Sequence, residues 1–289
     1  MLLPTAAAYA AVLRRSTHKK KKVLVLSSRG VTSSNIELVE DLLKLLPHAK
    51  KDAKFDKGNA LSTLVEIAEL SDCALCLYFE ARKRKDLYMW CGSIQDTGPS
   101  VKFLVQQVRP MSDPRLTGNC LLGSRPILSF DASFNDSATH RVFKGLLSTA
   151  FAAPKGHPRS KPFQDHVISF SCILGGRIVV RHYQVVPPSD KEKHEEASLV
   201  EIGPRFVLVP VRVLEGCFTG KTLYASAGYV SPNETRSDLK RKRSKTTVGH
   251  VAQKERRRER IGVEGVDQMA DDPFDDTFVD SDECFDGNE

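Results

Sequence analysis

The stretch LVEIGPRFVLVPVRVLEG, residues 199–216, restricts the possible folds of this chain more than any other segment. Gly203 can adopt backbone angles that are closed to other residues, while Pro204 has a fixed φ and also restricts the residue before it. The pair therefore predicts a sharp turn. The apolar, β-branched run of residues 206–213 is typical of a largely buried strand, in which Pro210 indicates a sheet edge or a bulge.

Two hydrophobic periods alternate along the rest of the chain up to about residue 230. Alternation predicts strands, and apolar residues three and four apart predict helices. The expected strands are 23–26, 73–79, 87–94, 101–108, 127–130, 166–174 and 177–186, and the expected helices are 60–70, 140–151 and one that ends at Pro47. The apolar face of that last helix is expected to consist of Ile36, Val39, Leu43 and Leu46. Together these patterns predict an α/β fold with mixed sheets (α+β).

Two of the strand pairs are predicted to be hairpins. The strands 73–79 and 87–94 enclose ARKRKD, so the four consecutive basic residues 82–85 are expected at the tip of a hairpin. Gly175 and Gly176 separate the last two strands of the series and are a strong signal for a two-residue hairpin loop.

Five segments together resemble the signature of a known family: SSRG (27–30), YFEARKRKDLYMW (78–90), GPSVKFLVQ (98–106), TGNCLLGSRPILSFD (117–131) and EIGPRF (201–206). They resemble the Brix-domain family of ribosome-assembly proteins, over residues 22–233. GPR is shared across the family, whereas DLYMW and LGSRPILSFD point to a large-subunit member. The resemblance implies a Brix domain of two similar halves, about 22–115 and 116–233, each resembling the anticodon-binding domain of a class of tRNA synthetases. The sequence itself shows no clear internal repeat.

The chain has a formal net charge of +7, and its basic and acidic residues are segregated along the sequence. Residues 1–21 are expected to be a disordered basic leader; a nuclear-type cluster at 19–22 is preferred, and a mitochondrial presequence is the alternative. Residues 234–289 form a basic-then-acidic tail, with 11 Lys/Arg against 3 Asp/Glu in 236–260 and 11 Asp/Glu with no Lys/Arg in 261–289. Disorder is expected there, or a helix formed on binding. A basic body with such a tail favours a polyanionic partner.

Neither a metal site nor a membrane partner is expected. The seven cysteines are scattered and mostly embedded in apolar runs, which favours reduced core thiols. Cys73 and Cys76 form a CxxC, but residues three apart on a strand point to opposite faces, and no second CxxC or histidine pair accompanies them. No apolar run approaches the length of a membrane span.

The sequence contains no catalytic constellation, so we expect no enzyme and no cofactor. GCFTGKTL at 216–223 has three residues where a phosphate-binding loop needs four, and the residues after it are poor helix formers. Asp165 and His166 are adjacent at the start of a strand, where neighbours are expected to face apart.

RNA binding through basic loops is the remaining chemistry, since Lys and Arg neutralise phosphates with modest sequence specificity. The candidate residues are Arg29, Arg82, Lys83, Arg84, Lys85, Arg125, Lys155, Arg159, Lys161 and Arg205. For Arg205, ligand contact and a structural salt bridge both stay open. Tyr78, Tyr88 and Trp90 either stack on unpaired bases or belong to the core.

The resemblance and the basic composition predict a non-enzymatic assembly factor of the large (60S) ribosomal subunit, located in the nucleus and nucleolus. Its expected partners are precursor ribosomal RNA, the pre-ribosomal particle, and another assembly factor that docks a helical segment on residues 22–233. The alternatives are a family relative that serves the small subunit and a protein-interaction scaffold that does not bind RNA directly.

Overall fold

The computed structural model of this chain describes residues 22–56, 60–94, 98–154, 157–173, 175–187 and 197–263. The predictions for the leader 1–21 and for the acidic residues 264–289 lie outside the described residues. The chain divides into two units, Met1–Tyr229 and Val230–Glu289.

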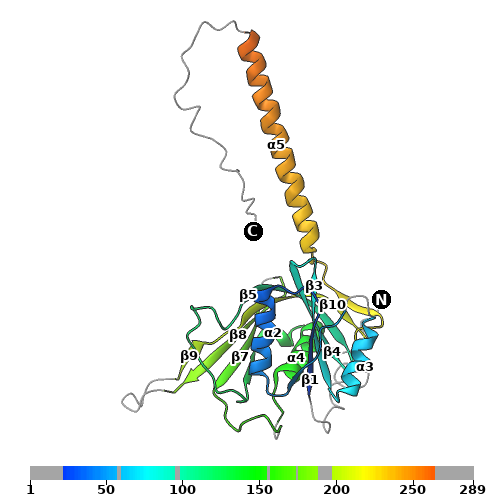
Figure 1. The fold of residues 1–289 in the computed structure, drawn as a ribbon, viewed down its shortest axis with the longest axis vertical. Coiled ribbons are helices and arrows are strands. Elements are labelled where there is room, and N and C mark those ends of the chain that lie inside the picture. The colour runs from blue at the N-terminus through cyan, green and yellow to red at the C-terminus, as the bar shows by residue number, and fades with distance from the viewer. Residues whose placement is uncertain are drawn as a thin grey trace, which may run out of the picture. The chain divides into compact units, whose positions relative to one another are not determined.

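The first unit is built on one mixed sheet, to which the described residues contribute eleven strands (Figure 1). The order is β2-β1-β3-β4-β5-β10-β8-β7-β6, with β11 paired to β10 and β9 paired to β8. The strands are β1 (Val23–Ser27), β2 (Ala49–Lys51), β3 (Leu75–Arg82), β4 (Asp86–Ser93), β5 (Ser100–Arg109), β6 (Ile127–Phe130), β7 (His166–Ile173), β8 (Arg177–Val186), β9 (Ser198–Glu201), β10 (Arg205–Leu214) and β11 (Thr222–Ala225). The helices are α2 (Ser33–Leu45), α3 (Ser62–Leu70) and α4 (Ala138–Phe151), with a short 3-10 helix at Ala132–Asn135.

The same succession of strands occurs twice in this sheet. In the first half β1 is parallel to β3, and β4 and β5 follow antiparallel; in the second half β6 is parallel to β7, and β8 and β10 follow antiparallel. A helix, α2 or α4, follows the first strand of each half, and the antiparallel pair β5–β10 joins the halves. The duplication is invisible in the sequence because each half needs apolar residues at its buried positions, not the same residues.

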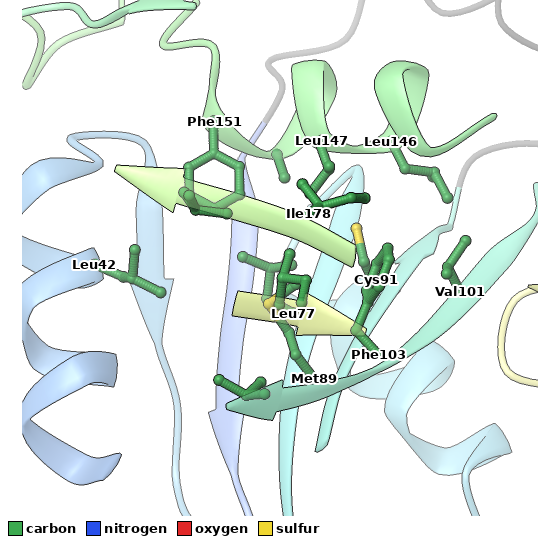
Figure 2. Close-up of a cluster of buried hydrophobic side chains, with 14 of the residues drawn as sticks. Leu42, Leu77, Met89, Cys91, Val101, Phe103, Leu146, Leu147, Phe151 and Ile178 are labelled. Atoms are coloured by element: carbon green, nitrogen blue, oxygen red, sulfur yellow. The ribbon is translucent and has the colours of Figure 1, made fainter. Parts of the chain in front are cut away.

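The main core lies where α2 and α4 cover one face of the sheet. Six residues of α4 form a continuous buried stripe, as their spacing predicts: Val142, Phe143, Leu146, Leu147, Ala150 and Phe151. Figure 2 shows Leu146, Leu147 and Phe151 directed from α4 toward the apolar side chains of the strands. The predicted face of α2 is partly wrong: Leu38, Val39, Leu42 and Leu45 are its buried apolar residues, whereas Ile36 and Leu43 are only half-buried.

A second, smaller core lies on the opposite face of the first half, where α3 packs. Leu64 and Ala68 of α3 are fully buried in a cluster that includes Tyr78 and Trp90 of the sheet. In the described part of the second half, no helix occupies this face. The two halves therefore differ in what covers the sheet.

The strand β10 confirms one of the two alternatives for Pro210 and shows the other to be wrong. β10 is a central strand, paired along one side with β5, and its register shifts between Pro210 and Arg212, so Pro210 lies at a bulge. On the other side β10 pairs with β8 through residues 206–208 and with β11 through residues 212–214. Because Pro210 lacks an N–H, this change of partner is where a proline fits inside a sheet. Gly203 has a φ of +83°, as the turn requires.

The described residues of the second unit form one long helix, α5 (Pro232–Val263), where the composition predicts disorder or a helix formed on binding. The backbone N–H of Glu234 donates to Ser231 Oγ (3.2 Å) and caps the first turn, and Pro232 occupies the first helical position, where no N–H is needed. The Lys, Arg, Gln and Glu residues that follow are strong helix formers. High charge and low hydropathy prevent burial of this segment but do not oppose a helix.

Candidate nucleic-acid interface

The tip of the β3–β4 hairpin brings four of the predicted RNA contacts together in an exposed turn. The N–H of Lys85 donates to the carbonyl of Arg82 (3.0 Å), and Lys83 and Arg84 have left-handed φ values of +49° and +53°. Left-handed φ at both central positions is the pattern of a type I′ hairpin turn, which favours Asn and Gly. Side chains with a Cβ pay a steric penalty there, so this turn places two cations where glycine would be more stable.

The loop after β1 lies against this tip. A Cβ on Gly30 would be 3.6 Å from Arg84 Cγ, and the neighbouring Arg29 holds Asp56 through Nε at 2.8 Å while 73% of its side chain stays exposed. The Nε of Arg82 lies 3.8 Å from Glu80 Oε1, and the side chain of Arg82 is also exposed. We call Arg29 together with residues 82–85 the hairpin cluster; the structure thus combines five candidates from two distant segments.

A second group of candidates, Arg125, Arg159 and Lys161, lies on the loops that precede β6 and β7. The N–H of Lys161 donates to the carbonyl of Gly123 (2.7 Å), and the N–H of Arg125 donates to the carbonyl of Phe163 (2.9 Å), so the two loops are joined. Arg159 and Lys161 are exposed and Arg125 is half-buried. Lys155 lies outside the described residues. We call these two joined loops, residues 121–125 and 159–163, the loop platform.

The hairpin cluster and the loop platform do not form one flat surface. The C-terminal ends of β1 and β3 and the N-terminal ends of β6 and β7 lie along the same end of the sheet. However, each strand of a sheet is rotated by about 20–25° relative to the next, and β7 is six strands away from β1, so the two groups face different directions. His157, just before the platform, meets the ring of His48 with centroids 6.5 Å apart, beside the start of β2. The candidates therefore form two separate basic surfaces.

Arg205, at the start of β10, forms a salt bridge, which was one of its two open alternatives. Its Nε lies 3.0 Å from Glu201 Oε1, and about a third of the side chain is exposed. Its register partner across the sheet is Arg109 of β5, which in turn lies 3.7 Å from Asp113. Two arginines opposite each other repel, and each is balanced by its own carboxylate. Arg109 was missed because nothing in the sequence indicates that β5 pairs with β10.

The aromatic residues proposed as base-stacking candidates belong to the core. Tyr78, Tyr88 and Trp90 are 2%, 3% and 1% exposed, so their rings are closed to RNA bases. Trp90 Nε1 donates to Glu80 Oε2 (2.9 Å), and Lys102 Nζ binds the same oxygen (2.9 Å).

Lys102 is a buried cation that the sequence did not single out. Its Nζ lies 4.4 Å and 4.5 Å from the ring centroids of Tyr88 and Trp90, a cation–π arrangement. Burial lowers the pKa of Lys102, although Glu80 opposes this. Burial also raises the pKa of Glu80, but hydrogen bonds from Trp90 and Lys102 together with the lysine charge outweigh it and hold that pKa below its usual value. The two side chains therefore form a part-buried ion pair between β3 and β5.

Two predictions placed nearby residues on opposite faces of a strand: Cys73 and Cys76, and Asp165 and His166. Both are wrong, because Cys73 and Asp165 precede their strands. Cys73 and Cys76 lie in the same buried cluster, where burial raises the pKa of both thiols. Asp165 Oδ1 lies 2.8 Å from His166 Nδ1. Among the described residues there is no group of three or more His, Cys, Asp or Glu placed to hold a metal ion.

The segment 216–223 has no phosphate-binding geometry. The N–H of Gly216 donates to the carbonyl of Thr219 (3.1 Å). The strand β11 follows, where a phosphate-binding loop would continue into a helix. No helix within the described ranges is long and apolar enough to cross a bilayer.

Comparison with known proteins agrees with the signature segments. The Brix domain family matches residues 28–212. The ribosome biogenesis protein BRX1 homolog of Rattus norvegicus is 41% identical over 90% of this chain and 71% of its own length. The Homo sapiens homolog is 44% identical over 74% of this chain and 58% of its own length. The ribosome biogenesis protein BRX1 of Saccharomyces cerevisiae is 43% identical over 84% of this chain and 86% of its own length.

Among solved structures, a probable ribosomal biogenesis protein from Aeropyrum pernix K1 matches with a TM-score of 0.43 and 17% identity, over 65% of this chain and 96% of that chain. The family match covers most of the sheet and both groups of basic loops. This chain belongs to the Brix domain family.

Proposed function

We propose that this protein is a non-enzymatic assembly factor of the large ribosomal subunit that binds precursor ribosomal RNA in the nucleolus. Family membership and the names of the relatives support the role in ribosome biogenesis. The observation that carries RNA binding is the hairpin cluster, where five exposed cations from two segments meet.

A comparison of the two halves strengthens this argument. The β7–β8 hairpin is the counterpart of β3–β4, and its turn has glycines, Gly175 and Gly176, at left-handed φ values of +84° and +70°. The closing bonds, from the N–H of Lys85 to the carbonyl of Arg82 and from the N–H of Gly176 to the carbonyl of Ile173, align Arg84 with Gly175, and Arg84 also has a left-handed φ. A turn selected for stability alone would have glycine at this position in both halves. We infer that Arg84 is retained for contact with a polyanion, at a cost in stability.

RNA binding is tested by changing this turn without weakening the fold. The variant Lys83→Asn/Arg84→Gly removes two charges and installs a preferred type I′ sequence. Its matched control is Lys44→Gln/Arg141→Gln, which removes two exposed charges that belong to neither basic group. With precursor ribosomal RNA fragments, the hairpin variant should bind several-fold more weakly, and its slope of log affinity against log salt should be about 1 to 2 smaller. Equal affinity of the two variants would exclude the hairpin cluster as an RNA contact.

The assignment to the large subunit is tested separately in cells. Depletion should lower mature large-subunit RNA and spare small-subunit RNA. The reverse pattern would favour the small-subunit alternative, and unchanged levels of both would contradict a role in ribosome assembly.

We also propose that a helix of another assembly factor covers the sheet face that is open in the second half. In the first half α3 covers this face. The corresponding surface of the second half includes the half-buried Val179 and Tyr183, the exposed Ile173 (46%) and the exposed Arg181. This surface fits an amphipathic helix with acidic flanks. Val179→Asp should abolish capture of the partner by nuclease-treated protein, and an unchanged capture would contradict this site.

A further inference from the structure

The loop platform carries an exposed apolar patch that the fold does not need. Leu121, Leu122 and Phe163 are 53%, 64% and 56% exposed, on the two loops that also carry Arg125, Arg159 and Lys161. Single exposed apolar residues are common, whereas three on two hydrogen-bonded loops are unusual, and groups of exposed apolar residues mark binding sites.

The backbone of the platform is closely packed and hydrogen-bonded. Besides the two bonds that join the loops, the N–H of Ser124 donates to the carbonyl of Leu121 (3.0 Å). Gly123 has a φ of +84°, and a Cβ there would lie 2.8 Å from the carbonyl oxygen of Arg159. Only glycine permits this approach, so the two loops are held in one arrangement.

A buried polar network ties the platform to β7. The Oγ of Ser124 donates to the carbonyl of Leu121 (2.7 Å) and lies 3.1 Å from His166 Nδ1, and both side chains are essentially inaccessible to solvent. The other oxygen of Asp165, Oδ2, accepts the N–H of Leu121 (2.6 Å). Ser124 and Asp165 both meet the imidazole at Nδ1, whereas a catalytic triad needs the serine at Nε2. The network positions the loop that carries Leu121 and Leu122.

The charges of the platform select the class of occupant. Asp165 is the only acidic residue within the ranges 117–126 and 157–165, and both of its carboxylate oxygens already have partners. An aromatic ring and two leucines flanked by three cations match an unpaired nucleotide, which has an apolar base face and an anionic phosphate. An acidic protein segment offers the charge but does not need a flat ring.

We propose that the loop platform is a stacking site for unpaired bases of RNA, with a base on the ring of Phe163, apolar contact from Leu121 and Leu122, and phosphates on Arg159 and Lys161. This inference rests on the proposed RNA binding and adds to it a preference for single-stranded segments. Stacking on one aromatic side chain changes affinity by roughly tenfold.

The test compares a single-stranded RNA oligonucleotide with a duplex of the same length, using the full chain. Phe163→Ala should weaken binding of the single strand roughly tenfold, leave the salt slope unchanged, and leave duplex binding nearly unchanged. Leu70→Ala is the matched control, because Leu70 is 88% exposed and lies on α3, outside the platform. Phe163→Trp should retain affinity, and its indole fluorescence should be quenched when a base stacks on it.

The outcomes separate this inference from the proposed function. If the wild-type protein binds neither RNA at low salt, both fail. If it binds both RNAs and Phe163→Ala binds the single strand as tightly as the wild type, the stacking site is overturned while RNA binding stands. A Phe163→Ala variant that loses a protein of the pre-ribosomal particle but no RNA affinity would also overturn it and assign the patch to a protein partner. Because Phe163 is exposed, an unchanged thermal midpoint should show that the variant is folded.

Discussion

Two buried neutral histidines should make this fold sensitive to mild acid. His182 of β8 is completely buried, and its Nδ1 lies 2.9 Å from the carbonyl oxygen of Pro204, in the turn that begins β10. His48 is 1% exposed, and its Nε2 lies 3.1 Å from the carbonyl of Ala150 at the end of α4. Burial lowers the pKa of each from 6.5 to about 4, more than the carbonyl contacts raise it.

The sign and size of the effect follow from these values. Since the folded pKa lies below the unfolded one, the unfolded chain takes up the protons first, and stability is lost as pH falls from about 6.5 toward 4. Between pH 7 and pH 5 each histidine should lower the free energy of unfolding by about 2 kcal/mol, and the two together by about 4 kcal/mol. Glu80 and Asp165 have lowered pKa values, so the stability they contribute is lost only at more acidic pH.

Urea unfolding at pH 7 and pH 5 measures this difference directly. The wild type should lose about 4 kcal/mol, His182→Gln and His48→Gln about 2 kcal/mol each, and the double variant little. Glutamine keeps a donor for the carbonyl oxygens but does not titrate. A double variant that loses as much stability between these pH values as the wild type would refute the reasoning.

Three further predictions concern the packing of the first unit. Gly203→Ala should destabilise the fold by at least about 2 kcal/mol in denaturant unfolding, because the φ of Gly203 is +83° and a Cβ there would clash with Leu116. Gly228→Ala is the control and should be nearly neutral, because the space around Gly228 is open. Phe151→Ala should cost about 3 to 5 kcal/mol in the same assay, since it empties a fully buried site; a loss below 1 kcal/mol would contradict its place in the core. Glu80→Gln should cost about 3 kcal/mol alone but less when combined with Lys102→Met, and strictly additive effects in this double-mutant cycle would show that the two do not act as a pair.

Local periodicity was sufficient to predict most of the elements. The six-residue stripe of α4 and the two hairpins follow from the spacing of apolar residues and from the turn residues, because helices and strands repeat with different periods. The same rule was ambiguous for α2, where closely spaced apolar residues satisfy more than one helical face, and the actual face includes Leu38 and Leu42. Which face is buried depends on the strands beneath the helix, which local spacing does not contain.

The candidate site was likewise predicted only in part from the sequence. The basic residues 82–85 at a hairpin tip were predicted correctly, because the strands that flank them define the turn. The stacking role of Tyr78, Tyr88 and Trp90 was wrong. Tyr78 and Trp90 lie in the cluster that includes α3 and Phe218, whose ring centroid is 6.0 Å from that of Trp90, and the hydroxyl of Tyr88 lies 2.8 Å from that of Tyr229. The exposed ring of Phe163 was missed, because its loop contains no periodic signal.

The sequence alone determined the elements, the turns and the charged loops, because these depend on interactions between residues a few positions apart. Only the tertiary structure decided which loops meet: Arg29 with the hairpin tip, the two loops of the platform, and Arg109 opposite Arg205. These contacts join segments tens of residues apart through strand pairing and through hydrogen bonds between backbones. Backbone groups are chemically alike in every residue, so their pairing across the sheet leaves no local pattern in the sequence from which it could be predicted.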